Sequence, residues 1–300
     1  MRIINLRNRL ALDVSKNGHS IAVDVAKASG GRFGPDPQSV YAVWDEFADW
    51  AAALAPGEAV GEPFDATELG APVPRPAQVF AIGLNYREHA LEAGAGLPER
   101  PMVFTKFPAA ITGPAGTVEL PAGDNDWEIE LVAVIGRRAD RVPPEQAWSH
   151  IAGLTVGQDL SERRSQVGGP APAQYSLAKS FRGFAPIGPA VVTPDEFTDP
   201  GDLALTCTLN GETVQEGRTG DMILGLAELV AHLSAVLPLL PGDLIFTGTP
   251  PGIGAARTPP RFLRAGDVLV SSIDGIGRMR HEFTDPTRDV TTDVAIKEHH

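Results

Sequence analysis

The chain has 300 residues and a mass of 31.7 kDa, which suits one large domain joined to a smaller one. Hydrophobic residues make up 43% of it and charged residues 21%, so the chain can form a packed core and does not belong to the disordered class. With 25 basic and 38 acidic residues, the net charge is −13, which argues against a nucleic-acid partner and against an anionic membrane surface. A small anionic substrate is still compatible with a local cation.

The cysteine content and the apolar segments indicate where the protein works. Its single cysteine, Cys207, allows no intrachain disulfide and no cysteine-based zinc cluster. The most apolar stretch, residues 226–240, is interrupted by Glu228 and Pro238 and is too short to span a bilayer. The first ten residues lack the apolar core of a signal peptide. We therefore expect a soluble cytoplasmic protein with no membrane partner.

The first 70 residues are predicted to form a small N-terminal domain. Three β-rich runs come first, at residues 3–6, 9–13 and 21–25. Apolar residues at helical spacing then predict a helix over residues 40–54. The proline-rich segment at residues 71–77 is predicted to be a linker.

Residues 78–285 are predicted to form a mainly β core domain, followed by a polar, frayed tail at 286–300. Short apolar runs alternate there with Gly, Pro and Asp, which favours strands and turns over long helices. Two β-rich runs flank Asn210-Gly211 and predict a hairpin. The clearest helix signal covers residues 224–237.

A pair of acidic residues begins one of the apolar runs. Glu128 and Glu130 stand at i and i+2 in DWEIELVAVIG, so on a strand both carboxylates point to the same face. Two adjacent carboxylates repel each other unless a cation lies between them, and oxygen-only ligands suit a hard divalent ion. The alternative is an exposed strand face with two solvated glutamates.

A third acid and a lysine extend this pattern. Asp159 follows the β-rich run LTVGQ, and a neighbouring strand would bring it to the same place; alternatively it caps a helix formed by SERRSQ. Three acids around a divalent ion leave a net charge of −1, so we expect a further cation nearby. Lys179, in YSLAKSF, is the candidate, and an ordinary surface lysine is the alternative.

Two further segments carry candidate chemistry. His89 and Glu92 stand at i and i+3 in NYREHALEAG, where they form either a base with its orienting carboxylate or a chance surface pair. The segment GDLIFTGTPPGIG contains neither a P-loop nor a dinucleotide-binding fingerprint. Its glycines would let backbone N–H groups and Thr249 approach a ligand closely.

Eight segments follow each other in the order typical of one family: IGLNYREHALEAG, FTKFPAAITGP, DWEIELVAVIG, GQDLSERRSQ, SLAKSF with PIGP, LNGETVQEG, LLPGDLIFTGTPPGIG and LRAGDVLVSSIDGIGRM. Over residues 78–284 the chain thus resembles the fumarylacetoacetate hydrolase family, in its bacterial and acylpyruvate-cleaving branch. The resemblance implies a mixed α/β, mainly β fold with a roll or sandwich core behind a small N-terminal domain. It also implies a homodimer.

The resemblance further implies roles for individual residues. The positions that match the family's metal ligands are Glu128, Glu130 and Asp159, for Mg²⁺ or Mn²⁺, with Ca²⁺ also open. The matching catalytic positions are Lys179 and the dyad His89–Glu92, which lies on a lid segment at residues 86–101. The matching substrate contacts are Tyr86, Arg163, Gln166 and Thr249.

The chain departs from the family pattern at two places. Where the family often has Ala-Arg-Asp, this chain has Glu162-Arg163-Arg164, and the extra charge of Arg164 either faces the site, favouring a dicarboxylate, or points to solvent. A fourth metal carboxylate has no counterpart, since the strand before the lid contains Phe80-Ala81-Ile82.

The family's substrates imply an activity in aromatic catabolism. The first expectation is a divalent-metal-dependent hydrolase that cleaves a C–C bond in a β-diketo acid, either an acylpyruvate or a compound like fumarylacetoacetate. The alternatives within enzymes are decarboxylation of oxaloacetate and isomerisation of a hydroxydienoate. The alternative from another class is an inactive binding protein on the same fold.

Overall fold

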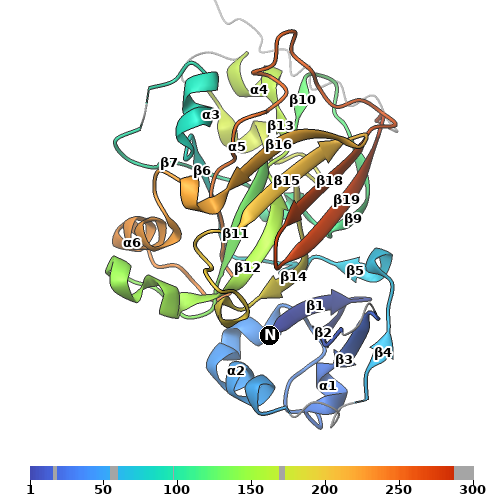
Figure 1. The fold of residues 1–300 in the computed structure, drawn as a ribbon. Coiled ribbons are helices and arrows are strands. Elements are labelled where there is room, and N and C mark those ends of the chain that lie inside the picture. The colour runs from blue at the N-terminus through green and yellow to red at the C-terminus, as the bar shows by residue number, and fades with distance from the viewer. Residues whose placement is uncertain (16–18, 55–59, 97, 169–172, 287–300) are drawn as a thin grey trace, which may run out of the picture.

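The computed structural model describes residues 1–15, 19–54, 60–96, 98–168 and 173–286, and Figure 1 shows how they are arranged. Within these residues the chain forms a 12-stranded sheet, a five-stranded sheet and a two-stranded ribbon. The helices are short and lie around the sheets. The structure therefore confirms the expected mixed α/β, mainly β fold class. The tail from residue 287 onward, expected to be frayed, lies outside the described residues.

The N-terminal segment forms one edge of the large sheet. Its elements are β1 (Arg2–Leu6), β2 (Arg9–Asp13), β3 (Ile21–Asp24), α1 (Val25–Ala28), α2 (Trp44–Ala53), β4 (Glu62–Pro63) and β5 (Leu69–Gly70). Strand β1 pairs antiparallel with β14 (Ala185–Val192), with Ile3 opposite Val191. The large sheet thus continues from the N-terminal strands into the core, and the domain bounds 1–70, 71–77 and 78–285 stay predictions.

The centre of the large sheet is buried on both faces. Its strands run in the order β14, β12 (Ile151–Gln158), β11 (Ile129–Ile135), β17 (Leu244–Phe246), β6 (Val79–Gly83) and β7 (Met102–Thr105). Along β11, alternate side chains enter two different cores, since Leu131 packs in one cluster and Val132 in the other. Trp44 and Phe47 of α2 belong to the second cluster, so the N-terminal segment covers that face.

The five-stranded sheet covers the other face. Its order is β16 (Glu212–Arg218), β15 (Ala204–Leu209), β18 (Val268–Ile273), β19 (Gly277–Thr284) and β9 (Ala115–Glu119). Burial alternates along β15, β18 and β19, as it does in a sheet with one face in the core and one toward solvent. The hairpin expected at Asn210-Gly211 is confirmed, and both residues have positive φ angles, 53° and 85°, as a two-residue turn requires.

The remaining elements are short apart from one helix. They are η1 (Ser39–Val43), η2 (Ala66–Glu68), α3 (Arg87–Glu92), η3 (Pro108–Ala110), β8 (Ile111–Thr112), β10 (Asn125–Asp126), η4 (Pro144–His150), β13 (Ser161–Glu162), α4 (Arg163–Val167), α5 (Tyr175–Ala178), η5 (Pro194–Glu196), η6 (Thr219–Asp221) and α6 (Leu226–Val236). Helix α6 confirms the strongest helix prediction and ends just before Pro238. Among the described helices, none has the length and apolar character needed to cross a bilayer.

The sheet brings four strand ends together at one end of the molecule. Because β11 and β12 are antiparallel, the start of β11 lies beside the end of β12, with Ile129 opposite Gln158. Strands β17 and β6 run parallel to each other and also end there. Helices α3, α4 and α5 lie over this end, opposite the N-terminal strands (Figure 1). The expected site residues come from these strand ends and helices.

Candidate metal centre and active site

Three buried carboxylates meet at this end of the sheet. Glu128 precedes β11, Glu130 lies within it and Asp159 follows β12. The backbone N–H of Asp159 donates to the carbonyl of Glu128 at 2.9 Å, which holds the two segments in register. Each carboxylate offers an oxygen within 4.8 Å of the others, and the three residues are 5%, 1% and 0% exposed. The alternative of solvated glutamates on an open strand face is therefore wrong.

The three carboxylates repel each other, and the pKa values of Glu130 and Glu128 are shifted in opposite directions. Burial, reinforced by the neighbouring carboxylates of Asp159 and Glu128, raises the pKa of Glu130 well above its usual range. Burial alone would also raise the pKa of Glu128, but the cations of Lys179 and Arg163 outweigh it and hold that pKa well below its usual range. The centre thus requires positive charge beside it.

Two buried lysines supply part of that charge. Lys179 Nζ donates to Glu128 Oε2 and to Asp159 Oδ2, both at 2.6 Å, and Lys179 is only 3% exposed, so it is not a surface lysine. Lys106 Nζ donates to Asp159 Oδ1 at 2.5 Å and to the carbonyl oxygen of Lys179. Lys106 is fully buried, and burial lowers the pKa of its amine although Asp159 opposes this.

Sequence reasoning missed Lys106. The available signal was a lysine inside the β-rich run MVFTKF, because a lysine in such a run is rarely buried without a partner. Its partner Asp159 lies 53 residues away, so no local spacing pointed to it.

The donor set fits a hard divalent ion. The ammonium of Lys179 already bridges two of the three acids, which shows that this group of carboxylates accommodates a cation. All three side chains offer oxygen atoms only, the ligand type that Mg²⁺, Mn²⁺ and Ca²⁺ prefer. Glu128, Glu130 and Asp159 are therefore the residues that would hold the metal.

The His89–Glu92 pair is an internal contact and not a chance surface pair. On α3, His89 Nδ1 lies 2.8 Å from Glu92 Oε1, and His89 is 6% exposed. The Glu92 carboxylate also accepts a hydrogen bond from the backbone N–H of Gly252 at 2.9 Å, which docks the helix onto the glycine-rich loop. With the Glu92 carboxylate as acceptor, Nδ1 carries the imidazole proton and Nε2 is left to accept one.

A cavity of about 110 Å³ lies against these groups. Its polar lining residues are His89, Glu128, Glu130, Arg163, Gln166, Lys179 and Thr249. Its apolar lining residues include Ile82, Leu84, Met102, Phe104 and Ile253, and Tyr175 also lines it. The cavity therefore suits a small molecule with an anionic end and a less polar end.

Most of the expected substrate contacts line this cavity, but Tyr86 does not. Its ring is 2% exposed, and its hydroxyl has no hydrogen-bond partner among the described residues. The hydroxyl proton of Thr249 is already in use, since Oγ1 donates to the carbonyl of Ile129 at 2.8 Å. Thr249 can therefore offer a ligand the surface of its side chain but not that proton.

The segment after β13 answers two questions that the sequence left open: which residue caps the following helix, and where the side chain of Arg164 points. The side chain of Glu162 caps α4 by accepting from the backbone N–H groups of Arg164 and Ser165, so Asp159 is not the cap. The Arg164 side chain is 70% exposed and makes two bonds of 2.9 Å to Asp124, so it points away from the cavity. It does not supply the extra charge that would favour a dicarboxylate.

The backbone N–H groups of the glycine-rich loop after β17 donate hydrogen bonds to two carboxylates of the protein. Gly248 N donates to Glu130 Oε2 at 2.8 Å, and Gly252 N donates to Glu92. Both glycines have positive φ angles, 100° and 106°, and a Cβ on Gly252 would lie 2.2 Å from the carbonyl oxygen of Val214. The expected close approach of backbone N–H groups is present, and among the described contacts it is made to the protein's own acids.

A strand-rich fold with a buried carboxylate centre and a dyad beside one cavity defines a divalent-metal-dependent enzyme. Residues 78–284 match the family model for the fumarylacetoacetate hydrolase C-terminal domain. The chain belongs to the fumarylacetoacetate hydrolase family. This confirms the resemblance seen in the sequence motifs.

Three similar proteins place the chain within this family. The mitochondrial oxaloacetate tautomerase FAHD2A of Bos taurus is 42% identical over 209 residues, which cover 69% of this chain and 66% of the relative. The match thus spans slightly less than two thirds of the relative's length. A crystal structure of a protein assigned as HpcE from Mycobacterium smegmatis is 52% identical, with a TM-score of 0.88, covering 95% of this chain and 99% of that one.

The third protein contains a metal ion and a bound 2-oxo acid in the same fold. It is maleylpyruvate hydrolase from Sphingobium sp. SYK-6 in complex with manganese(II) and pyruvate. It is 26% identical, with a TM-score of 0.77, and covers 95% of this chain and 99% of that one. The relatives therefore differ in reaction, since one is a tautomerase and another a hydrolase.

Proposed function

We propose that this protein is a divalent-metal-dependent hydrolase that cleaves the C–C bond of an acylpyruvate-type β-diketo acid. The observation that carries the proposal is the His89–Glu92 dyad, paired at 2.8 Å, beside a cavity lined by His89, Lys179 and two acids of the buried carboxylate cluster. A hydrolase needs a base for water in addition to a centre that stabilises an enolate, and His89 and the acid cluster are the groups that we assign to these two tasks. The related hydrolase with manganese and pyruvate supports the same product class.

The metal centre would be formed by Glu128, Glu130 and Asp159, with Mg²⁺ or Mn²⁺ as the proposed ion and Ca²⁺ as a further candidate. When bound, the ion supplies Lewis-acid stabilisation for the carboxylate and 2-oxo group of the substrate. The ammonium of Lys179 faces the same cavity and stabilises negative charge on the substrate's oxygens. Arg163 and Gln166 orient the anionic end of the substrate, and the apolar wall receives the acyl group.

The dyad would move the protons. His89 Nε2 removes a proton from water as the water oxygen bonds to the acyl carbonyl carbon. The bond between that carbon and C3 then breaks, and its electron pair stays on C3 as the enolate of pyruvate. The imidazolium returns the proton to C3, so that one water is consumed and a carboxylic acid and pyruvate are released. Glu92 holds the imidazole and stabilises its charged form.

A proton-transfer reaction is the second candidate. The similarity to an oxaloacetate tautomerase supports it, because keto–enol conversion needs a base and an enolate site but no attacking water. Isomerisation of a hydroxydienoate would use the same base and enolate site, whereas decarboxylation of oxaloacetate would use the enolate site and depend less on the base. A binding protein without activity is the least supported alternative. The cavity lining includes His89, Lys179 and two of the three acids, and the remaining members of the dyad and the acid cluster are bonded to these residues.

The deciding experiment separates these reactions with labelled water. Acylpyruvates, fumarylacetoacetate and oxaloacetate are incubated with the protein and Mn²⁺ or Mg²⁺ in H₂¹⁸O, with excess chelator as the control. We expect metal-dependent release of pyruvate from an acylpyruvate with one ¹⁸O in the new carboxylic acid. Turnover of oxaloacetate alone, without any cleavage of diketo acids, would overturn the hydrolase proposal in favour of the second candidate.

The assembly and location of the protein are also proposals. We propose a homodimer in the cytoplasm, with residues 1–70 as a small N-terminal domain. The edge strand β7 offers a surface for a second copy, because Val103 is 41% exposed and the nearby Phe107 46% exposed. A sedimentation experiment at micromolar concentration that finds only a 32 kDa species would contradict the dimer.

A further inference from the structure

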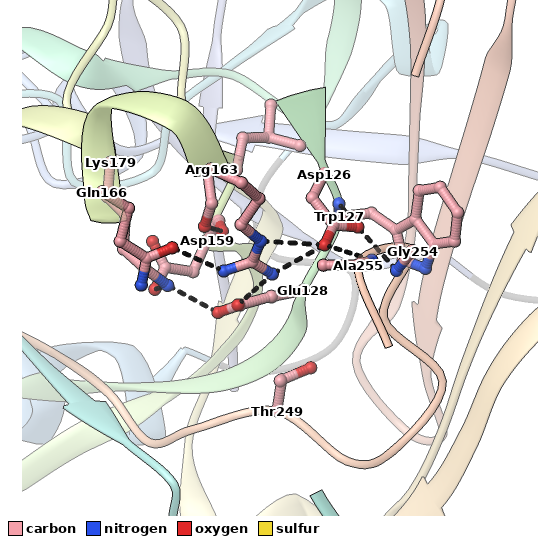
Figure 2. A network of polar contacts seen from close by, with 12 residues as sticks. Asp126, Trp127, Glu128, Asp159, Arg163, Gln166, Lys179, Thr249, Gly254 and Ala255 are labelled. Atoms are coloured by element: carbon pink, nitrogen blue, oxygen red, sulfur yellow. Dashed lines mark hydrogen bonds and ion pairs between the residues drawn. The ribbon is translucent and has the colours of Figure 1, made fainter. Parts of the chain in front are cut away.

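Asp126 is a fully buried carboxylate that the proposed reaction does not use. It lies on β10, two residues before the metal centre, and is 0% exposed. Its Oδ1 accepts from the backbone N–H groups of Trp127 at 2.8 Å and Gly254 at 2.7 Å. Its Oδ2 accepts from Ala255 N at 3.0 Å and from Arg163 Nε at 2.9 Å, as Figure 2 shows. The carboxylate is therefore held from several sides.

The contacts of Arg163 leave little of its guanidinium free. Nε donates to Asp126, and Nη2 lies 2.8 Å from Asp126 Oδ2 and donates to Glu128 Oε1 at 2.6 Å. Nη1 donates to Gln166 Oε1 at 3.0 Å. A guanidinium has five N–H groups; three of them donate in these hydrogen bonds, and Nη2 also makes an ion-pair contact with Asp126. Among the described residues, one N–H on Nη1 is left without a protein acceptor, on a side chain that lines the cavity.

We propose that Asp126 is a positioning residue that fixes Arg163 so that this one N–H meets the carboxylate of the substrate. The inference rests on the proposed function, because it takes a 2-oxo acid as the ligand. Asp126 binds the edge formed by Nε and Nη2, and the planar shape of the guanidinium then directs Nη1 toward Gln166 and the cavity. The fixed geometry lowers the entropy cost of binding the substrate.

Asp126 also protects the metal centre from Arg163. Among the described residues, Glu128 is the second acid that pairs with this guanidinium, and it is a proposed metal ligand. Without Asp126, Arg163 can turn its Nε–Nη2 edge toward Glu128 and bind it in a bidentate way. That rearrangement would withdraw Nη1 from the cavity.

The chain contains a matched control for this ion pair. Asp124 and Arg164 form the same kind of contact, with Nε and Nη2 each 2.9 Å from a carboxylate oxygen. Their side chains are 29% and 70% exposed, and neither lines the cavity. Arg163 contacts Asp124 through the backbone, where its N–H donates to the Asp124 carbonyl at 3.0 Å. Asp124→Asn keeps that bond and therefore perturbs a neighbouring Asp–Arg pair without removing a side-chain contact of Arg163.

The first test is a double-mutant cycle on ligand binding. Pyruvate is titrated into Mn²⁺-loaded wild type, Asp126→Asn, Arg163→Met and the double variant, and Mn²⁺ itself into the metal-free forms. We expect Asp126→Asn to weaken pyruvate binding by about 10- to 100-fold, the range for a residue that orients a ligand-binding group, and to change the Kd of Mn²⁺ by much less. In the Arg163→Met background the same substitution should have no further effect on pyruvate. Asp124→Asn should bind pyruvate as wild type does.

The outcomes separate this inference from the proposed function. Equal losses of pyruvate affinity with and without Arg163 would overturn the inference, because Asp126 would then act through the Gly254 loop. Wild-type affinity in Asp126→Asn would overturn it as well, with the proposed function intact. If wild type itself fails to bind pyruvate, the proposed function fails. In that case the positioning role is tested by NMR, which measures how fast the Nε–H of Arg163 exchanges with water. Slow exchange in wild type that becomes fast in Asp126→Asn supports the role. Equal exchange rates in the two proteins refute it.

A second variant covers the case in which Asp126→Asn does not fold. Asp126→Glu keeps the charge but moves it by one methylene, so it should keep Arg163 paired yet misplaced. We expect a higher KM for the diketo acid with a smaller change in kcat. An unchanged KM in this variant would contradict the inference.

Discussion

The ammonium of Lys106 lies 2.5 Å from the carboxylate of Asp159, and no part of Lys106 reaches solvent. The same Nζ donates to the backbone carbonyl of Lys179, so one lysine links a proposed metal ligand to the segment that carries the second lysine. Lys106 therefore fixes Asp159 Oδ1 and leaves Oδ2 to accept from Lys179. A buried ion pair of this kind is costly to break from one side.

Replacing Lys106 should destabilise the protein strongly. Lys106→Met keeps the side-chain length but leaves Asp159 buried without this partner, and removing one partner of a buried pair costs about 3–5 kcal/mol in the free energy of unfolding. Urea denaturation measures the loss. Arg138→Met, which removes an exposed pair with Asp140, should leave the unfolding midpoint unchanged. Wild-type stability in Lys106→Met would show that this contact contributes little.

Metal binding should stabilise the protein through the three acids. Glu130 is buried beside Asp159 and Glu128, so a divalent ion relieves their repulsion and binds only the folded state. We expect Mn²⁺ to raise the Tm of wild type and excess chelator to lower it and abolish activity. Glu130→Gln should raise the Tm of the metal-free protein, because the repulsion is gone, and should lose most of the Mn²⁺-induced shift. A wild-type Mn²⁺ shift in this variant would exclude Glu130 as a ligand.

The parts that could be predicted from sequence depend on neighbouring residues. The hairpin at Asn210-Gly211 follows from local turn chemistry, and α6 follows from helical spacing. The convergence of Glu128 and Glu130 follows from the period of two along a strand. Each of these signals lies within one element, where periodicity and side-chain type are sufficient.

The parts that were missed depend on tertiary contacts. Lys106 meets an acid 53 residues away, and Asp126 binds a backbone N–H 128 residues away, so no spacing in the sequence joins them. The pairing of β1 with β14 is of the same kind. Tyr86 is the opposite case, a contact that was expected but is not found. The family match placed it among the substrate contacts, whereas its buried ring does not line the cavity. Local patterns specify elements, whereas partners depend on how the sheet assembles.

The single thiol should be unreactive in the folded protein. Cys207 is 0% exposed on β15, and burial raises the pKa of its thiol to about 12, so very little thiolate forms near neutral pH. We expect no reaction with a disulfide reagent at pH 8 until the protein is unfolded, when one thiol per chain should react. Rapid reaction of the native protein would mean that the five-stranded sheet opens readily.

The segment at residues 86–101, of which residue 97 lies outside the described residues, is predicted to act as a lid in the free enzyme. Helix α3 is tied down by the contact between Glu92 and Gly252, whereas Leu91 is 63% exposed. We expect amide hydrogens at residues 93–96 to exchange rapidly without ligand and to be protected by Mn²⁺ with pyruvate. Slow exchange throughout these residues in the free protein would argue against a lid.

The dyad gives the strongest test of reaction class. If the reaction is hydrolysis, His89→Ala should lower the rate by about 10²–10⁴-fold, the usual contribution of a general base. Glu92→Gln keeps an acceptor for Gly252 but removes the charge that stabilises the imidazolium, so its loss should be smaller but in the same direction. In oxaloacetate decarboxylation no water is activated, and both variants should retain more of the wild-type rate.

A control on the same helix makes this comparison specific. Glu88 is exposed on α3 and does not line the cavity, so Glu88→Gln changes the charge of the helix without touching the dyad. It should hydrolyse a diketo acid at the wild-type rate. The variants are compared with saturating Mn²⁺, so that differences in metal occupancy do not enter the rates. Full hydrolytic activity in both His89→Ala and Glu92→Gln would show that the dyad is structural, and that the water must be activated elsewhere in the cavity.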